Sequence, residues 1–262
     1  MKKEMTMKND TMTKRAVIVG ATSGIGREVA LCLLKKGWKL GLAGRRLSLL
    51  QELKQRAPGQ IEIQMLDVTD ERAEEALTDL IERLGGMNLF LLSSGIGFQN
   101  TALRADIELN TVRTNVEGFT RLVDAAFRYF KAHNDRHCAG QLAVISSIAG
   151  TKGLGVAPAY SATKRFQNTY IDALEQLANL QHLNLHFTDI RPGFVATDLL
   201  NDGKQYPLLM QVESVAKRIT RALERKERVV VIDGRYRVLV FFWRLIPRWL
   251  WKRLPIQVND KS

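Results

Sequence analysis

Short apolar runs alternate with helical patterns along most of the chain, and this alternation limits the possible folds more than any other feature. Strands are expected at residues 16–19, 39–43, 61–66, 89–92, 142–145, 185–190 and 229–232, with helices at about 24–36, 47–54, 71–84, 109–131, 158–180 and 212–225. A strand that is apolar throughout is buried on both faces, as in a parallel sheet covered by helices. The pattern therefore predicts an α/β fold with a doubly wound parallel sheet of about seven strands.

Length and composition indicate one domain. The chain has 262 residues, of which 45% are hydrophobic and 25% charged, the usual mixture for a globular protein. Its two cysteines, Cys32 and Cys138, lack paired or metal-type spacing, so neither a disulfide framework nor a zinc site is expected. Residues 1–14 are polar and are expected to be a disordered lead-in rather than a secretory signal. These features predict a cytoplasmic protein with its catalytic domain at residues 15–234.

The net charge of +12 is unevenly distributed. Residues 1–15 carry five Lys/Arg against two acids, and residues 235–262 carry seven against one, which leaves only +3 for the body of the chain. A nucleic-acid groove would need basic residues across the body. Nucleic acid is therefore not expected as a partner.

A glycine-rich turn joins the first expected strand to the first expected helix. It reads Gly20-Ala21-Thr22-Ser23-Gly24-Ile25-Gly26. Glycines at this place let the backbone approach a pyrophosphate, which the free N–H groups of the helix N-terminus then stabilise. With a strand before it and a helix after it, the turn predicts dinucleotide binding in a Rossmann-type domain.

The end of the second strand indicates which dinucleotide is bound. An acid about 20 residues after the glycines holds the ribose of NAD, whereas arginine suits the 2′-phosphate of NADP. This chain has Arg45 and Arg46 there, and no acid before Glu52. Arg45 is the expected phosphate ligand, with Arg46 in support, unless both are only surface residues at the start of the second helix. NADP(H) is favoured over NAD(H).

Tyr160 and Lys164 lie four residues apart in an expected helix, and Tyr160 follows Ser147 by thirteen residues. Positions i and i+4 share a helix face, so the ammonium can lie beside the phenol and favour loss of its proton. A tyrosine and a lysine at this spacing are common on solvated helix faces, so the pair alone does not indicate a site. Together with Ser147 and the glycine turn, it indicates proton transfer beside a nicotinamide.

These motifs together resemble the classical short-chain dehydrogenase/reductase family, from about residue 15 to 232. The resemblance implies that Ser147, Tyr160, Lys164 and Asn115 are catalytic, with Asn115 holding a water between Lys164 and solvent. It also implies cofactor contacts from Tyr160, Lys164 and the glycine turn. The further implied cofactor contacts are Asp67 and Val68 after the third strand, Gly95 after the fourth, and Pro192, Val195 and Thr197 after the sixth.

Two positions depart from the family pattern. Val19 stands where a threonine usually precedes the first glycine, and Leu92-Ser93-Ser94-Gly95 replaces the usual Asn-Asn-Ala-Gly. The second change loses an asparagine that helps to join the central strands, a role in which the Ser93 hydroxyl could partly substitute. The catalytic residues are all present, so an active enzyme is still expected.

The resemblance implies an NADP(H)-dependent oxidoreductase that reduces a carbonyl or oxidises the corresponding alcohol. Tyr160 would be the general acid or base, Ser147 would donate to the reacting oxygen, and Lys164 would lower the pKa of the phenol. A catalytically silent NADP(H)-binding sensor or scaffold is the alternative. The segment from Asp198 to Gln211 is rich in leucine and predicts an apolar lid, hence an apolar small-molecule substrate. A homo-oligomer is left open.

The tail at residues 235–262 is basic and aromatic, and contains three of the four tryptophans. One amphipathic helix, or two shorter ones divided at Pro247, fits the pattern. The tail is expected either to lie on a membrane surface or to cover the substrate site or a subunit partner. Elsewhere, His133, His137 and Cys138 cluster at a polar helix end, and no metal site is expected there.

Overall fold

The computed structural model describes residues 14–135, 138–200 and 205–256. His137, nearly all of the expected lead-in and four residues of the expected lid lie outside these ranges. The strands are β1 (Arg15–Val19), β2 (Lys39–Gly44), β3 (Ile61–Met65), β4 (Leu89–Leu92), β5 (Gly140–Ile145), β6 (Leu185–Arg191) and β7 (Val229–Val231). The longer helices are α1 (Gly24–Leu34), α2 (Leu47–Arg56), α3 (Ala73–Leu84), α4 (Ala105–Val112), α5 (Phe119–Ala132), α6 (Pro158–Leu180), α7 (Val212–Glu224) and α8 (Gly234–Leu245).

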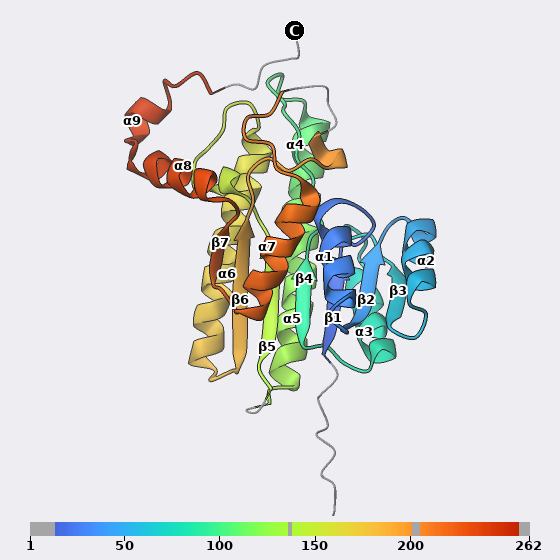
Figure 1. The fold of residues 1–262 in the computed structure, drawn as a ribbon. Helices are drawn as coiled ribbons and strands as arrows, with labels where there is room; N and C mark the ends of the chain where they lie inside the picture. Colours follow the sequence, from blue (N-terminus) through green and yellow to red (C-terminus); the bar gives the residue numbers. More distant parts are fainter. Residues whose placement is uncertain (1–13, 136–137, 201–204, 257–262) are drawn as a thin grey trace, which may run out of the picture.

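The seven strands form one parallel sheet in the order β3-β2-β1-β4-β5-β6-β7, as Figure 1 shows. In the register of the central strands, Ile18 pairs with Leu42 on one side and with Leu91 on the other. The predicted doubly wound sheet is therefore confirmed. Its strand order reverses between β1 and β4, and ligands of such sheets bind outside the carboxyl ends of the strands at this reversal.

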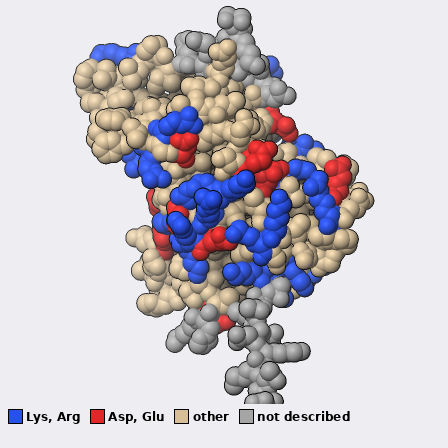
Figure 2. All heavy atoms as spheres, viewed as in Figure 1, with Lys and Arg blue, Asp and Glu red and all other residues tan. Residues whose placement is uncertain are grey.

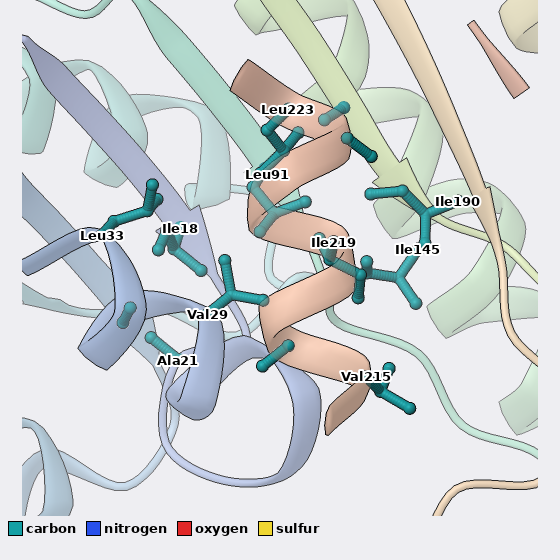
Figure 3. Close-up of a cluster of buried hydrophobic side chains, with 14 of the residues drawn as sticks. Ile18, Ala21, Val29, Leu33, Leu91, Ile145, Ile190, Val215, Ile219 and Leu223 are labelled. Atoms are coloured by element: carbon teal, nitrogen blue, oxygen red, sulfur yellow. The ribbon is translucent and has the colours of Figure 1, made fainter. Parts of the chain in front are cut away.

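Helices cover both faces of the sheet. Successive residues of β1 point to opposite faces, so Ala16 and Ile18 belong to one buried cluster and Val17 and Val19 to the other. The first cluster lies under α1, α2, α7 and α8, and Figure 3 shows part of it where Val29 and Ile219 face the strands. The second lies under α3, α5 and α6. Burial on both faces explains why the strands read as continuous apolar runs.

The helical region before β5 is longer and less regular than the sequence predicts. It begins at Ala105, four residues before the expected start, and contains a π-helical turn at Arg113–Gly118 between α4 and α5. The wide turn includes Asn115, which is fully buried. Single π turns inside α-helices are frequent at functional sites.

The C-terminal segment forms two helices, not one. α8 follows β7 directly, ends at Leu245, and is separated by Pro247 from the short helix α9 (Arg248–Trp251). Proline lacks a backbone N–H and cannot continue a helix, so it occupies the position before the first turn of α9. Both helices lie at the carboxyl end of the sheet (Figure 1). Within the described ranges, no helix is long and apolar enough to span a bilayer.

Candidate active site

The glycine turn forms a tight cradle at the carboxyl end of β1. Gly20 has a φ of +90°, and a Cβ there would lie 2.6 Å from the Ser94 backbone nitrogen in the loop after β4. A Cβ on Gly26 would lie 2.2 Å from the Gly20 carbonyl oxygen. Gly24, at φ +55°, faces the Thr197 methyl group, and Ile25 packs partly against the core. Only glycine fits these positions, and the free N–H groups that begin α1 suit a pyrophosphate.

The two arginines after β2 have different surroundings. Arg46 donates from Nη2 to Ser23 Oγ at 2.6 Å and to Thr22 Oγ1 at 3.0 Å, so its guanidinium lies against the glycine turn. Arg45 extends outward with a side chain that is 73% exposed and is 4.0 Å from the Asp67 carboxylate. Arg46 therefore lies closer to the glycine turn than Arg45, and the expected order, with Arg45 first and Arg46 in support, stays a prediction. Hydrogen bonds fix Arg46, and only a weak surface ion pair holds Arg45.

The pair after β3 divides into an exposed and a buried residue. Asp67 Oδ1 accepts from the backbone nitrogen of Thr69 at 3.0 Å and from its hydroxyl at 2.8 Å. Val68 is buried, and its carbonyl oxygen accepts from Arg121 at 3.2 Å. A Cβ on Gly118 would meet this same carbonyl at 2.6 Å. The pair is therefore held against the start of α5, next to the ends of β1 and β2.

Ser147 and Tyr160 meet beyond the end of β5. Ser147 caps a short 3₁₀ turn, where its Oγ accepts from the Ala149 nitrogen at 3.1 Å. Burial raises the pKa of the half-buried Tyr160 phenol, and a hydrogen bond with the Ser147 side chain opposes that rise. The Lys164 Nζ lies over the Tyr160 ring, 5.8 Å from its centroid, and the expected lowering of the phenol pKa by Lys164 stays a prediction. Tyr160 is therefore a protonated phenol at neutral pH.

Lys164 is buried and held by neutral groups. Its Nζ donates to the Ile145 carbonyl at 3.1 Å and to Gln167 Oε1 at 3.0 Å. Burial lowers the pKa of the ammonium to about 8, an effect that the negative charge of Asp189 opposes. A Cβ on Gly95 would lie 3.3 Å from both Lys164 Nζ and Asn115 Oδ1, so the Gly95 backbone lies directly over the pair.

Gln167, which was not predicted from the sequence as a site residue, links Asn115 to Lys164. The Asn115 side chain holds the loop after β4, because its Oδ1 accepts from the Ile96 nitrogen at 2.9 Å and its Nδ2 donates to the Ile96 carbonyl at 2.6 Å. The Asn115 main-chain oxygen accepts from Gln167 Nε2 at 2.9 Å. Gln167 therefore bridges Lys164 and the main chain of Asn115, and the expected water between Lys164 and solvent stays a prediction.

Two further features of the site were missed. A Cβ on Gly97 would lie 2.4 Å from Tyr160 Cδ2, so the Gly97 backbone packs against the Tyr160 ring. Beneath the site, Asp189 accepts from Ser146 and from Asn168 Nδ2, the latter at 2.9 Å, and pairs with Arg191 at 2.6 Å. In the sequence these polar residues lie within apolar strands and one helix, and only the fold brings them together.

The segment after β6 completes the site. The Pro192 carbonyl accepts from the Ile148 nitrogen at 3.1 Å, and Thr197 Oγ1 donates to the Val195 carbonyl at 3.3 Å. Val195 pairs with Met210, which closes the expected lid segment at its base. Tyr236 of α8 anchors this segment, since its hydroxyl donates to the Pro207 carbonyl at 2.8 Å and accepts from the Phe194 nitrogen at 3.1 Å.

The expected cofactor contacts therefore converge at the carboxyl ends of β1 to β6. Arg45 and Arg46 are both exposed, and Arg45 lies 4.0 Å from the Asp67 carboxylate. The glycine positions that no side chain could occupy and the arginine against the turn suit a dinucleotide. Among the described residues, no cluster of three or more metal-ligating side chains occurs.

Comparison with known proteins agrees with this architecture. Residues 14–206 match the family model for short chain dehydrogenase. An uncharacterized oxidoreductase of Myxococcus xanthus is 31% identical over 95% of this chain and 96% of its own length. The dehydrogenase/reductase SDR family member 7B of Bos taurus is 29% identical over 91% of this chain and 79% of its own length.

Solved structures share the fold at lower identity. The 3-ketoacyl-(acyl-carrier-protein) reductase from Brucella melitensis complexed with NADH has a TM-score of 0.74 at 20% identity, over 84% of this chain and 97% of that one. ElxO with NADP bound has a TM-score of 0.73 at 22% identity, over 86% and 99% of the two chains. The extent of the family match, together with the seven-stranded parallel sheet, shows that this chain belongs to the short-chain dehydrogenase/reductase family of oxidoreductases.

Proposed function

We propose that this protein is an NADP(H)-dependent oxidoreductase that reduces a carbonyl group, or oxidises the corresponding alcohol, of an apolar small molecule. The observation that carries the proposal is the arrangement of Ser147, Tyr160 and Lys164 around one point beyond the ends of β4 and β5. When bound, the nicotinamide supplies or accepts the hydride. The remaining work, which is proton transfer and charge stabilisation, falls to residues of this chain.

In the reducing direction, negative charge develops on the carbonyl oxygen, and Tyr160 donates its proton to that oxygen. The phenol of Tyr160 is protonated at neutral pH, so it can donate its proton in this direction. Ser147 donates a hydrogen bond to the same oxygen. Lys164 supplies a positive charge beside the phenol and a donor toward the nicotinamide ribose.

NADP(H) is the proposed cofactor because Arg46 lies at the glycine turn. A planar guanidinium that already contacts Thr22 and Ser23 can bind a 2′-phosphate bidentately with little loss of side-chain entropy. Solved relatives of this fold are known with NADH and with NADP, so the fold alone does not favour either cofactor. The arginine is the specific support.

An apolar substrate is proposed from the segment before α7. Leu208 and Leu209 are exposed there, and the ring of Tyr206 packs on Phe194 with 4.8 Å between centroids. These side chains lie on the part of the chain that begins just after Thr197. A series of carbonyl compounds of increasing chain length should show rising kcat/KM, and a preference for small polar sugars would contradict the proposal.

The Tyr160→Phe variant tests the function as a whole. It should bind NADPH with a Kd close to that of the native protein and lose at least about a hundredfold in turnover, because the proton donor is gone while the ring is kept. NADPH titration and NADPH oxidation with a carbonyl substrate measure the two properties. Retained turnover would contradict the assignment. Absence of turnover in the native protein with every carbonyl would favour the silent sensor or scaffold.

A further inference from the structure

Helix α8 has two apolar faces, and the described part of the chain covers only one of them. Tyr236, Leu239, Val240 and Trp243 follow the i, i+3, i+4, i+7 spacing of one face and pack on the core. Val238, Phe241, Phe242 and Leu245 repeat the same spacing on the opposite face, and their exposed fractions lie between 58% and 63%. A helix that is apolar all round is normally buried all round. The outer face therefore needs a partner.

Contacts of the covered face hold the two helices firmly on the protein. Trp251 is buried in α9, where its Nε1 donates to the Gly153 carbonyl at 2.7 Å and its ring packs against Trp243. Lys152 donates to the Ile246 carbonyl at 2.8 Å. The turn between α8 and α9 is thus fixed to the loop that joins Ser147 to α6. These contacts hold the helices that carry the outer apolar side chains in place on the protein.

The charges around this face select its partner. Residues 234–256 contain six Lys/Arg and no acid. On the helical wheel of α8, Arg237 and Arg244 lie on one side of the outer apolar stripe and Arg235 on the other. Trp249, in α9, is 63% exposed and lies under the Arg253 guanidinium. In Figure 2 this region, at the upper left, is largely uncharged surface with Lys and Arg at its edges.

We propose that the outer face of α8 and α9 binds the surface of an anionic lipid bilayer. Exposed Phe, Trp and Leu flanked by arginines are what an interfacial helix uses, with the apolar side chains in the acyl boundary and the cations at the lipid phosphates. A second copy of the chain fits less well. A two-fold contact through this face would place its arginines against the arginines of the partner.

Flotation of the full-length protein with vesicles tests the proposal. The native protein should float with vesicles that contain phosphatidylglycerol and much less with pure phosphatidylcholine vesicles. Phe241→Ser/Phe242→Ser should weaken binding at least about tenfold, since two aromatic anchors are lost. The matched control is Leu177→Ser/Leu180→Ser, which changes two exposed leucines of α6 and should float like the native protein. Thermal unfolding of each variant checks that the fold is retained.

The opposing outcomes are distinct. Failure of the native protein to float with anionic vesicles, or flotation of Phe241→Ser/Phe242→Ser equal to that of the native protein, would overturn the proposal. So would sedimentation that shows a native dimer which this variant abolishes, because the face would then be a contact between copies. None of these measurements uses turnover, so they are independent of the proposed reaction.

A separate observation concerns Gln167. Its side-chain amide is buried and uses both ends, with Oε1 accepting from Lys164 Nζ at 3.0 Å and Nε2 donating to the Asn115 carbonyl at 2.9 Å. The other charged or titratable groups around Lys164 are Tyr160 on α6 and, on β6, Asp189, whose charge is shared with Arg191. Gln167 is thus a buried group that directly contacts the ammonium.

We infer that Gln167 is a positioning residue that keeps Lys164 charged and aimed at the reacting groups. The inference rests on the proposed function. An amide oxygen partly replaces the water that a buried ammonium has lost, and the bond from Nε2 to Asn115 fixes the direction of that oxygen. The bond from Nε2 to Asn115 also ties α6 to the π turn, whereas the bond from Oε1 to Lys164 lies within α6.

The pH dependence of kcat/KM for NADPH reports on groups of the free enzyme and tests this role. Gln167→Met removes the acceptor and should move the alkaline limb to lower pH, whereas Gln167→Glu adds a negative charge and should move it to higher pH, each on the order of one pH unit. If Gln167 had a purely structural role, the alkaline limb would stay in place in both variants or would move in the same direction in both. Either result would overturn the inference. Absence of native turnover would instead count against the proposed function.

Discussion

At the residue scale, glycines in the neighbouring loops determine where the proposed catalytic side chains can lie. Gly97 is the clearest case, since its backbone packs on the Tyr160 ring and leaves no room for a Cβ. Gly95 similarly packs close to Lys164, whose Nζ would lie 3.3 Å from a Cβ at that position. The sequence motif identifies the proposed reacting side chains, but the neighbouring loops determine where those side chains lie.

Gly97→Ala should therefore displace the Tyr160 ring and lower kcat/KM at least about a hundredfold, because a misplacement of about 1 Å is enough for such a loss. Gly155→Ala is the matched control, since a Cβ there meets nothing within 4 Å and activity should be unchanged. Steady-state kinetics and thermal unfolding of both variants measure the effect. Equal activity of the two variants would show that the Gly97 contact is unimportant.

Arg46 should decide the choice of dinucleotide. Arg46→Ala is expected to raise the KM for NADPH ten- to a hundredfold, on the order of a lost hydrogen bond to a charged group, with little change for NADH. Arg45→Ala, which removes the more exposed of the two arginines, should have a smaller effect. A larger loss in the Arg45 variant would contradict this expectation and support the order predicted from the sequence.

At the scale of elements, α8 connects the tail to the site. Tyr236 is buried, its ring packs on Gly193, and its hydroxyl holds the strand-like base of the segment before α7. The helix therefore supports the segment proposed to contact substrate, besides presenting its outer face to a partner. Pro247 then ends this support and lets α9 turn back toward Gly153.

Tyr236→Phe keeps the ring but removes the hydroxyl, and should cost about 1 kcal/mol of unfolding free energy because a buried hydrogen-bond pair is lost. The loosened segment should raise KM for the carbonyl substrate more than it changes KM for NADPH. Urea unfolding and kinetics with each substrate varied measure these effects. Equal changes in both KM values would place Tyr236 outside the substrate segment.

At the scale of the whole molecule, the buried site makes stability depend on pH. The pKa of Lys164 falls to about 8 in the folded protein, against an ordinary value of 10.5. Between these values the unfolded chain holds a proton that the folded chain has released, so this group makes stability rise with pH. Below about pH 8 both states are protonated and the contribution is constant.

Lys164→Met removes that contribution. The unfolding free energy of the native protein should therefore increase relative to that of Lys164→Met as the pH rises from 7 to 9.5, in urea titrations at both values. The raised pKa of Tyr160 acts in the opposite sense only near and above pH 10, outside this comparison. A constant difference between the two proteins would mean that Lys164 titrates normally.

The sequence by itself determined the sheet, the glycine turn and the Ser147, Tyr160 and Lys164 set. These depend on local pattern, since buried strands must be apolar and a turn against a neighbouring loop must be glycine. Only the tertiary structure decided that Arg46 rather than Arg45 lies at the turn, that Gln167 of α6 contacts the main chain of Asn115, and which face of α8 packs on the core. These features depend on which side chains become neighbours when distant elements pack. The spacing of residues along the chain does not show which side chains these are.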